Sequence, residues 1–407
     1  MAGATWAYRV RNREGTIVEG TMDAESSNAV AARLRAQNLF PLEIRSTKKK
    51  GLSMEINILP QRVKLKDLAI FSRQFATMIG SGLSLLRSLT ILTEQTSNKK
   101  LAETVGLVRD DVEGGSSLSN SMAKYPKVFQ PLFVSLVRAG ETGGSLEIVL
   151  ERIADSYEKD YKLRQKIKSA MTYPVVVFMI AGVLVSIMLV FIVPTFAEMF
   201  DDLGGELPLP TKILVFLSEK AIIIIPLAIA FAIGGFIAYK RGRRSSENVR
   251  FRTDKIKLKM PVFGDLFIKI ALARFARTLS LLLRSGVPVL QALEITAEAA
   301  GNAVIGRAAT DVRSSVREGE SIAGPLMNHK VFPPMVVQMI SVGEDTGQVD
   351  DMLDKIADFY EQEVESTTES LTAMLEPLMI AVLGGLVGAM VIALYMPMFK
   401  IFDLIGE

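Results

Sequence analysis

Two glycine-rich turns contain the residue types that come closest to a phosphate-binding loop. They are Glu113-Gly-Gly-Ser-Ser117 and Gly140-Glu-Thr-Gly-Gly-Ser145. A nucleotide-binding P-loop continues with Lys-Ser or Lys-Thr, because the lysine reaches the outer phosphates. Neither turn continues in this way, and the chain contains no Gly-Lys dipeptide. We therefore interpret both turns as helix caps, in which glycine ends one helix and serine or threonine begins the next.

Other reactive residue types are scarce in the chain. It has no cysteine and a single histidine, His329, which excludes cysteine ligation, disulfides and a two-histidine metal site. The acidic pairs Asp110-Asp111 and Asp201-Asp202 offer at most weak ligands for a divalent ion. No set of residues for covalent or acid–base catalysis stands out, and the net charge of +3 does not indicate nucleic acid binding. We predict a protein that is not an enzyme and needs no cofactor or metal.

The sequence around these turns occurs twice. Phe71-Ser-Arg-Gln-Phe75 returns as Phe275-Ala-Arg-Thr-Leu279, Gly140-Glu-Thr-Gly-Gly144 as Gly343-Glu-Asp-Thr-Gly347, and Val193-Pro194 as Met396-Pro397. Within each copy, apolar residues fall on one helical face and Ser-Gly pairs end the helix, with few strand-like runs between the breaks. A period of this length indicates a duplicated structural unit. We expect each copy to be a compact bundle of about six helices that ends in a long apolar run.

Three uncharged or nearly uncharged runs are long enough to cross a membrane. At about 1.5 Å per residue, roughly 20 apolar residues span a hydrocarbon core. Basic residues flank the first two runs on one side, at Arg164–Lys168 and Lys240–Arg244, whereas the intervening loop is acidic. By the positive-inside rule, the N-terminus and both repeats lie in the cytoplasm. No signal-peptide core precedes them.

These patterns predict an all-α integral membrane protein with two cytoplasmic bundles, three transmembrane helices and a small N-terminal α/β module. The predicted order is a ββαβ-like module with its hairpin turn at Asn12–Gly15 (1–47), a basic linker (48–65), the first bundle (66–173), a transmembrane helix (174–196), an acidic periplasmic loop (197–212), a second transmembrane helix (213–239), a basic cytoplasmic linker (240–266), the second bundle (267–376), a third transmembrane helix (377–399) and a periplasmic tail (400–407).

The uncharged runs 174–196, 221–239 and 377–399 contain no Asp, Glu, Lys, Arg or His, although ion-coupled transporters usually place an ionisable residue at mid-membrane. The third span instead has Gly384 and Gly388 at the spacing that lets helices approach closely, and Gly182 and Ser186 do the same in the first. Such faces either pack the three spans together or form a seam for a second subunit or a foreign helix.

The last helix of each bundle is expected to run on into the membrane, with Pro174 and Pro377 at the entry, where proline bends a helix. Each such helix would pass movement of a bundle to a span. The second of them is acidic, with Asp354, Asp358 and Glu361 among its carboxylates. This acidic run is either a solvated face or a surface for a basic partner.

At this point the chain resembles a known family, the inner-membrane platform proteins of type IV pilus and type II secretion machines (the PilC/GspF family). The resemblance covers essentially the whole chain. It rests on the order and duplication of five motifs: Phe71-Ser-Arg-Gln-Phe-Ala-Thr-Met78, Asp111-Val-Glu-Gly-Gly-Ser-Ser-Leu118, Ala139-Gly-Glu-Thr-Gly-Gly-Ser-Leu146, Phe191-Ile-Val-Pro-Thr-Phe196 and Gly205-Glu-Leu-Pro-Leu-Pro-Thr211.

The resemblance implies a multi-pass inner-membrane protein that oligomerises, is engaged by a hexameric cytoplasmic ATPase and turns ATPase motion into extraction of pilin or pseudopilin helices, together with other inner-membrane assembly proteins. Candidate coupling residues are Gly140, Glu141, Gly143, Gly343, Glu344, Gly347, Pro174, Pro377, Asp354, Asp358 and Glu361, with Gly384 and Gly388 for helix packing. For the turns and prolines, caps and kinks are the alternative. A type II secretion platform, a transport permease and a membrane-bound enzyme using His329 stay open as other functions.

Overall fold

The computed structural model describes residues 4–11, 17–24, 27–36, 39–46, 62–202 and 207–405. The predicted hairpin turn at Asn12–Gly15, nearly all of the predicted basic linker (48–65) and part of the predicted acidic loop therefore lie outside the described residues. The chain forms two compact units, Met1–Arg62 and Val63–Glu407.

The N-terminal unit is a three-stranded antiparallel sheet with one helix, in the order β2-β1-β3. Its elements are β1 (Ala4–Arg11), β2 (Ile17–Ala24), α1 (Ser27–Ala36) and β3 (Phe40–Ser46). Val10, Ala24, Val30 and Leu34 form its buried core. The predicted ββαβ order is confirmed.

The first repeat has six helices in the described range 62–187. They are α2 (Leu65–Gly80), α3 (Leu85–Gln95), α4 (Lys99–Glu113), α5 (Leu118–Ala123), α6 (Pro131–Thr142) and α7 (Leu146–Ile187). Side chains cap the N-termini of two of these helices. At α4, Asn98 accepts from the backbone amides of Lys100 and Leu101, and at α5, Ser117 accepts from the backbone amide of Asn120. Four phenylalanines of the core, Phe71, Phe75, Phe129 and Phe133, lie with ring centroids 5.2 to 6.4 Å apart.

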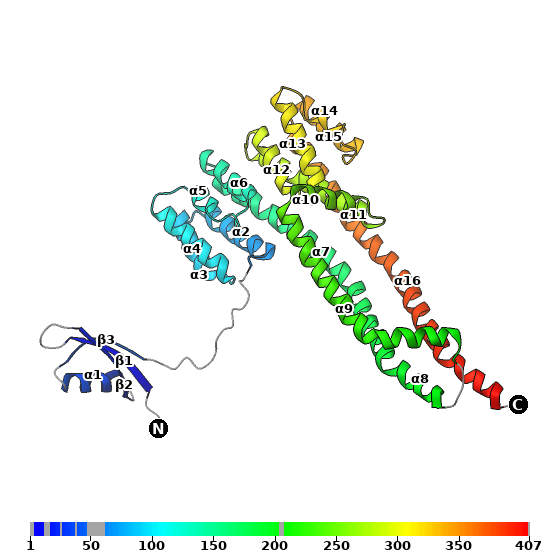
Figure 1. The fold of residues 1–407 in the computed structure, drawn as a ribbon. Coiled ribbons are helices and arrows are strands. Elements are labelled where there is room, and N and C mark those ends of the chain that lie inside the picture. Colours follow the sequence, from blue (N-terminus) through cyan, green and yellow to red (C-terminus); the bar gives the residue numbers. More distant parts are fainter. Residues whose placement is uncertain are drawn as a thin grey trace. The chain divides into compact units, whose positions relative to one another are not determined.

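The second repeat has the same six-helix order. Its helices are α11 (Phe263–Arg284), α12 (Val289–Ala299), α13 (Ala303–Arg317), α14 (Ala323–Leu326), α15 (Pro334–Thr346) and α16 (Val349–Ile405). The expectation of about six helices in each bundle is confirmed. Buried residues of both repeats belong to one continuous apolar core, because α7 packs against α16 and α6 contacts α11 and α12. Figure 1 shows the long helices α7 and α16 leaving the bundles together.

The segment between the second span and the second bundle differs from the sequence-based expectation. We predicted a linker over 240–266, whereas the structure contains an additional helix there, α10 (Glu247–Leu258). Ser246 caps it by accepting from the amide of Val249, and its Asp254 is buried against neighbouring helices. The sequence analysis did not anticipate this helix, because its few apolar residues lie among many basic ones, and the boundaries 240–266 stay a prediction.

Among the described residues, three helices are long and apolar enough to cross a membrane, over Leu146–Met199, Leu209–Arg243 and Val349–Pro397. The first comprises α7, a π-helical turn η1 (Met188–Ile192) and α8 (Val193–Asp202). The second is α9 (Leu209–Ser245) and the third is α16. The last helix of each bundle therefore continues into a span, as expected. α8 and α9 also extend into the region predicted as a loop, since helix continues to Asp202 and resumes at Leu209.

Candidate coupling site on the two long helices

The same arginine–carboxylate contact recurs in both repeats, where the first helix of the bundle meets the long helix. In the first repeat, Arg73 of α2 binds Asp155 and Glu158 of α7, with 2.7 Å from Nε to the Glu158 carboxylate. In the second, Arg277 of α11 binds Asp358 and Glu361 of α16, with 3.0 Å from Nε to Glu361. We name these the first and the second arginine cluster.

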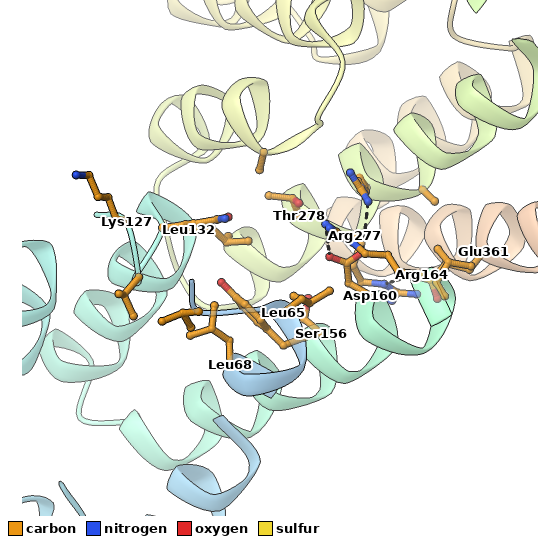
Figure 2. Close-up of a pocket in the computed structure, with 18 residues that line it drawn as sticks. Leu65, Leu68, Lys127, Leu132, Ser156, Asp160, Arg164, Arg277, Thr278 and Glu361 are labelled. Atoms are coloured by element: carbon orange, nitrogen blue, oxygen red, sulfur yellow. Dashed lines mark hydrogen bonds and ion pairs between the residues drawn. The ribbon is translucent and has the colours of Figure 1, made fainter. Parts of the chain in front are cut away.

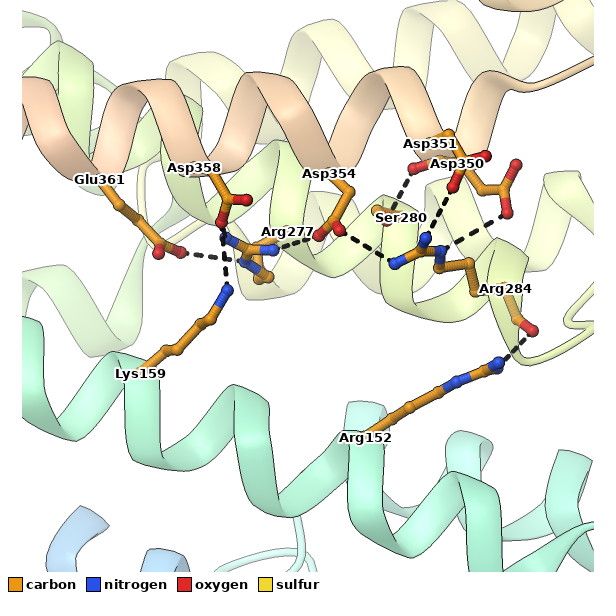
Figure 3. Close-up of polar contacts among 10 residues, drawn as sticks. All are labelled: Arg152, Lys159, Arg277, Ser280, Arg284, Asp350, Asp351, Asp354, Asp358 and Glu361. Carbon is orange, nitrogen blue, oxygen red and sulfur yellow. Dashed lines mark hydrogen bonds and ion pairs between the residues drawn. The ribbon is translucent and has the colours of Figure 1, made fainter.

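The second arginine cluster is larger and more buried than the first. The side chain of Arg277 is 14% exposed, against 36% for Arg73. Arg277 also binds Asp354, a member of the second cluster that also accepts from Arg284 at 2.9 Å. Figure 3 shows these carboxylates in a row along α16, with the two arginines of α11 facing them.

These contacts shift the pKa values of the groups involved. In the first cluster, the hydrogen bond from Arg73 lowers the pKa of Glu158, against the effect of burial. In the second, burial raises the pKa of Asp358, but Arg277 and Lys159 outweigh burial and leave it lowered. Burial lowers the pKa of Arg277, while Glu361 and Asp358 raise it, and the net shift is upward. Neighbouring cations therefore favour the ionised form of Glu158 and of Asp358.

The two long helices are also joined to each other by polar contacts. Lys159 of α7 donates to Asp358 of α16 at 3.1 Å, so Asp358 belongs both to the second cluster and to the seam between repeats. Lys166 pairs with Glu365, and Arg152 donates to the backbone carbonyl of Arg284. The acidic residues Asp354, Asp358 and Glu361 thus find basic partners within the chain. A role for them in binding another protein stays a prediction.

A pocket of about 330 Å³ lies at the same seam. Figure 2 shows side chains from α2, α7, α11 and α16 pointing into it. Asp160 of α7 accepts from Arg164 at 2.9 and 3.0 Å and lies 3.5 Å from Arg274 of α11. Burial lowers the pKa of Arg274. The pocket therefore lies within a charged seam, next to the second arginine cluster.

The glycine–acid turns join the last two helices of each bundle. The carboxylate of Glu141 accepts from the backbone amides of Leu118 and Ser119, and that of Glu344 accepts from Ile322 and Ala323. Each glutamate thereby satisfies the free amides at the start of a short helix, α5 or α14. The capping interpretation thus describes their contacts, and a role in binding a partner is still a prediction.

The first glycine of each turn lies where two helices approach closely. A Cβ on Gly343 would lie 2.9 Å from Cα of Val349, and one on Gly140 would lie 3.1 Å from Cα of Leu146. Gly347 has φ +70°, which favours glycine. Gly143 ends α6, and its amide donates to the carbonyl of Ala139. These glycines set the angle at which α7 and α16 begin.

The candidates in the spans have a different environment. Pro174 and Pro377 lie inside α7 and α16, which continue past them as helices. A Cβ on Gly384 or Gly388 would meet no atom within 4 Å, and the same holds for Gly182. Close packing of the three spans therefore does not occur at these glycines within the chain. They line open surface instead.

Sequence reasoning missed two contacts of α9. Thr211 donates to the carbonyl of Ala393 in α16, and Ser218 donates to that of Leu189 in η1. Both hydroxyl residues are at least 97% buried. Pro397 has no N–H for the carbonyl four residues earlier, that of Ala393. In the π-helical turn, Val193 donates to Met188, so Leu189 would need an N–H from Pro194, which has none. Pro194 and Pro397, which recur in the two repeats, were the sequence signal that could have indicated these carbonyls without a helical donor.

The remaining reactive residue types lie apart from the arginine clusters. Among the described residues, no group of three or more histidine, cysteine or acidic side chains could hold a metal. His329 lies 3.5 Å from Asp311 on the second bundle. The site consists of ion pairs and hydrogen bonds between helices, in a membrane protein whose duplicated bundles continue into its spans.

Comparison with known proteins agrees with this class. Residues 71–194 and 275–397 each match the family described as "Type II secretion system (T2SS), protein F", and residues 1–45 match its N-terminal domain. The chain belongs to the type II secretion system protein F family, which confirms the resemblance drawn from the motifs.

Relatives match over nearly the full length of the chain. It is 45% identical to the type IV pilus assembly protein PilC of Thermus thermophilus, covering 97% of this chain and 98% of the relative. It is 42% identical to PilC of Myxococcus xanthus, covering 98% and 95%. Identity to the type II secretion system protein F of Aeromonas hydrophila is 36%, covering 84% and 88%.

Proposed function

We propose that this protein is a non-enzymatic inner-membrane platform of a type IV pilus assembly machine. In this role it couples a hexameric cytoplasmic ATPase to the extraction and polymerisation of pilins. The full-length likeness to pilus assembly proteins at 45% and 42% identity, against 36% for the secretion relative, is the observation that carries the proposal. The basic flanks of the spans support a cytoplasmic N-terminus and bundles, and the proposed domain boundaries are those predicted from the sequence.

The arginine clusters give the proposed coupling a physical route. An ATPase that displaces one bundle would move α2 or α11, and the clusters join these helices to α7 and α16. Each long helix is continuous from bundle to span. Because Lys159 and Lys166 of α7 form ion pairs with α16, movement of one repeat would also displace the long helix of the other. Nothing in this route requires chemistry in the chain itself.

An open apolar groove suits the proposed pilin contact. It has a volume of about 600 Å³ and is lined by α7, η1 and α9, including Gly182, Ser186 and Pro226. The small side chains allow close approach of an apolar helix. Gly384 and Gly388 on α16 offer a second close-packing face, suited to a further copy of this chain or another inner-membrane assembly protein.

A reversible cross-link between the repeats tests the coupling. In the chain, which has no cysteine, Lys166→Cys and Glu365→Cys replace an exposed ion pair between α7 and α16. The double-cysteine variant is expressed in a strain that lacks the wild-type gene. A membrane-permeant bifunctional methanethiosulfonate should then stop pilus assembly, and a reductant should restore pilus assembly. The measurement is surface pilin before and after reduction.

The matched control places both cysteines within one helix, as Lys100→Cys with Glu103→Cys on α4. Its cross-link should leave pilus assembly intact. Complete cross-linking at 166 and 365 with normal pili would refute coupling through relative movement of the repeats. Loss of protein secretion with normal pili would assign the type II secretion role instead.

A further inference from the structure

Helix α10 follows the second span almost without a break. α9 ends at Ser245 and α10 begins at Glu247, with Ser246 in an extended conformation between them. The uncharged run of α9 ends at Tyr239, so six residues, or about 9 Å of helix, separate it from this corner. Lipid headgroups extend roughly 5 to 8 Å beyond the hydrocarbon core on each side. α10 therefore begins close to the outer limit of the headgroups.

One face of α10 is fixed against the rest of the protein. The carboxylate of Asp254 is 2% exposed, accepts from Arg243 of α9 at 2.6 Å and accepts from the backbone amide of Ala303 of α13 at 3.1 Å. The ring of Phe251 lies 5.0 Å from the guanidinium of Arg307, also on α13. The second bundle therefore occupies one side of α10, and Figure 1 shows the spans leading away from its other side.

The turn after α10 fixes its direction. Val262 has φ +71° and ψ −49°, and the amide of Phe263 donates to the carbonyl of Pro261 at 2.8 Å, which closes a γ-turn. In the part of the chain that the structure describes, Val262 is the only non-glycine residue with positive φ. A β-branched residue adopts this conformation only at a cost, so the surrounding contacts must hold it there.

The opposite face of α10 is apolar and uncovered. Val249 and Ile256 are seven residues apart, which places them on one side of α10, away from Asp254, and Met260 follows in the turn after the helix. With Val262 in the turn, these side chains are 39 to 64% exposed. Basic residues flank the stripe, and those that are exposed are Arg252, Lys255 and Lys259. We name this surface the outer face of α10.

We propose that the outer face of α10 lies on the headgroups of anionic phospholipids in the adjacent leaflet. An apolar stripe bordered by lysine and arginine is the pattern of helices that lie in the membrane interface. Anionic lipid attracts such cations within a Debye length of the surface. The charge and the apolar stripe both match a lipid surface. The contacts of α10 with the second bundle fix the orientation of the outer face. This inference requires only that α9 spans the membrane, whatever machine the protein serves.

A fluorescent label on single cysteines of the otherwise cysteine-free full chain tests the proposal. Ile256→Cys reports on the outer face, and Met327→Cys, at a 70% exposed residue after α14, is the matched control. Both labelled variants are reconstituted in nanodiscs that contain nitroxide-headgroup lipid, with either phosphatidylglycerol or phosphatidylcholine as the bulk lipid. The label at 256 should be quenched at least about twofold more than the label at 327, and more strongly with phosphatidylglycerol.

Reversing the charges beside the stripe identifies the lipid contribution. Arg252→Glu with Lys259→Glu, in the Ile256→Cys background, should abolish the difference between the two lipids. Equal quenching at 256 and 327 in either lipid would overturn the proposal. So would a label at 256 that becomes protected only when a purified assembly ATPase is added, because the outer face would then be a protein-binding surface.

Discussion

At the scale of single residues, Arg277 and Arg73 occupy equivalent places but different surroundings. Arg277 is mostly buried and faces three carboxylates, whereas Arg73 is more exposed and faces two. Removing the partner of buried charges leaves those charges uncompensated, which costs far more than removing one partner of an exposed pair. The duplicated fold therefore allows the buried Arg277 and the more exposed Arg73 to be compared at equivalent positions.

Replacing each arginine with alanine should separate the two environments. Arg277→Ala is expected to lower the free energy of unfolding by about 3 kcal/mol, and Arg73→Ala by about 1 kcal/mol or less. Chemical denaturation of the solubilised protein provides the measurement. Arg277→Lys keeps the charge without the planar fork and should fall between them. Equal losses for the two alanine variants would contradict the burial argument.

The lowered carboxylate pKa values predict a loss of stability in acid. Glu158 and Asp358 have ordinary values of 4.5 and 3.8, and both are lowered in the folded protein. The unfolded chain therefore binds protons first as the pH falls, so the contribution is present above about pH 4.5 and is lost below it. The melting temperature should fall between pH 5 and pH 3.

Removing a titrating group identifies the source of this pH dependence. Glu158→Gln should make the fall in melting temperature shallower, because the amide cannot take up a proton. Glu103→Gln, at an exposed residue on α4, is the matched control and should leave the slope unchanged. An identical slope in the Glu158→Gln variant would show that the first arginine cluster contributes nothing to the acid response.

At the scale of elements, α9 holds the two repeat-derived spans through its hydroxyl groups. The carbonyls that accept from Thr211 and Ser218 have lost their usual partner to proline or to the π-helical turn. Hydrogen bonds between membrane helices contribute modestly, because the unfolded chain in lipid also finds partners. These two bonds nevertheless determine which carbonyl each helix presents to α9.

Thr211→Val and Ser218→Ala should each lower the free energy of unfolding by about 1 kcal/mol. The double variant should lose about the sum, since the two bonds lie on different helices. Titration with SDS in mixed micelles measures the effect. Ser186→Ala is the control, because its hydroxyl donates within its own helix to Gly182 and joins nothing else. A loss as large in that variant would refute the interhelical account.

Elements were predicted more fully than their contacts. The apolar periodicity of Leu68, Phe71 and Phe75 and the Ser-Gly breaks predicted about six helices in each repeat, because both signals are local. α10 was missed, since its apolar residues are few among lysines and arginines. The pairing of Arg73 with Glu158 spans 85 residues of sequence, and periodicity indicates a face without naming what lies opposite.

At the scale of the whole molecule, the duplication predicted the architecture, and the family match repeats along the same two segments. It did not predict that one apolar core joins the repeats. The direction in which Gly384 and Gly388 face was also undetermined, because either face of an apolar helix can be packed or exposed to lipid. The acidic residues of α16 were predicted to be solvated or to bind a partner, whereas their cations lie on α11 and α7.

The positions of Thr211 and Ser218 have a further consequence for motion. Both hydrogen bonds lie at the end of the spans remote from the bundles, near the chain's passage from α8 to α9. If the spans tilted relative to one another about these two points, the bonds would stay intact and the displacement would grow with distance from them. The spans would then separate most at the end nearest the bundles. Another helix that inserts between the spans would enter from that end, and the two hydrogen bonds would act as the pivot at the opposite end.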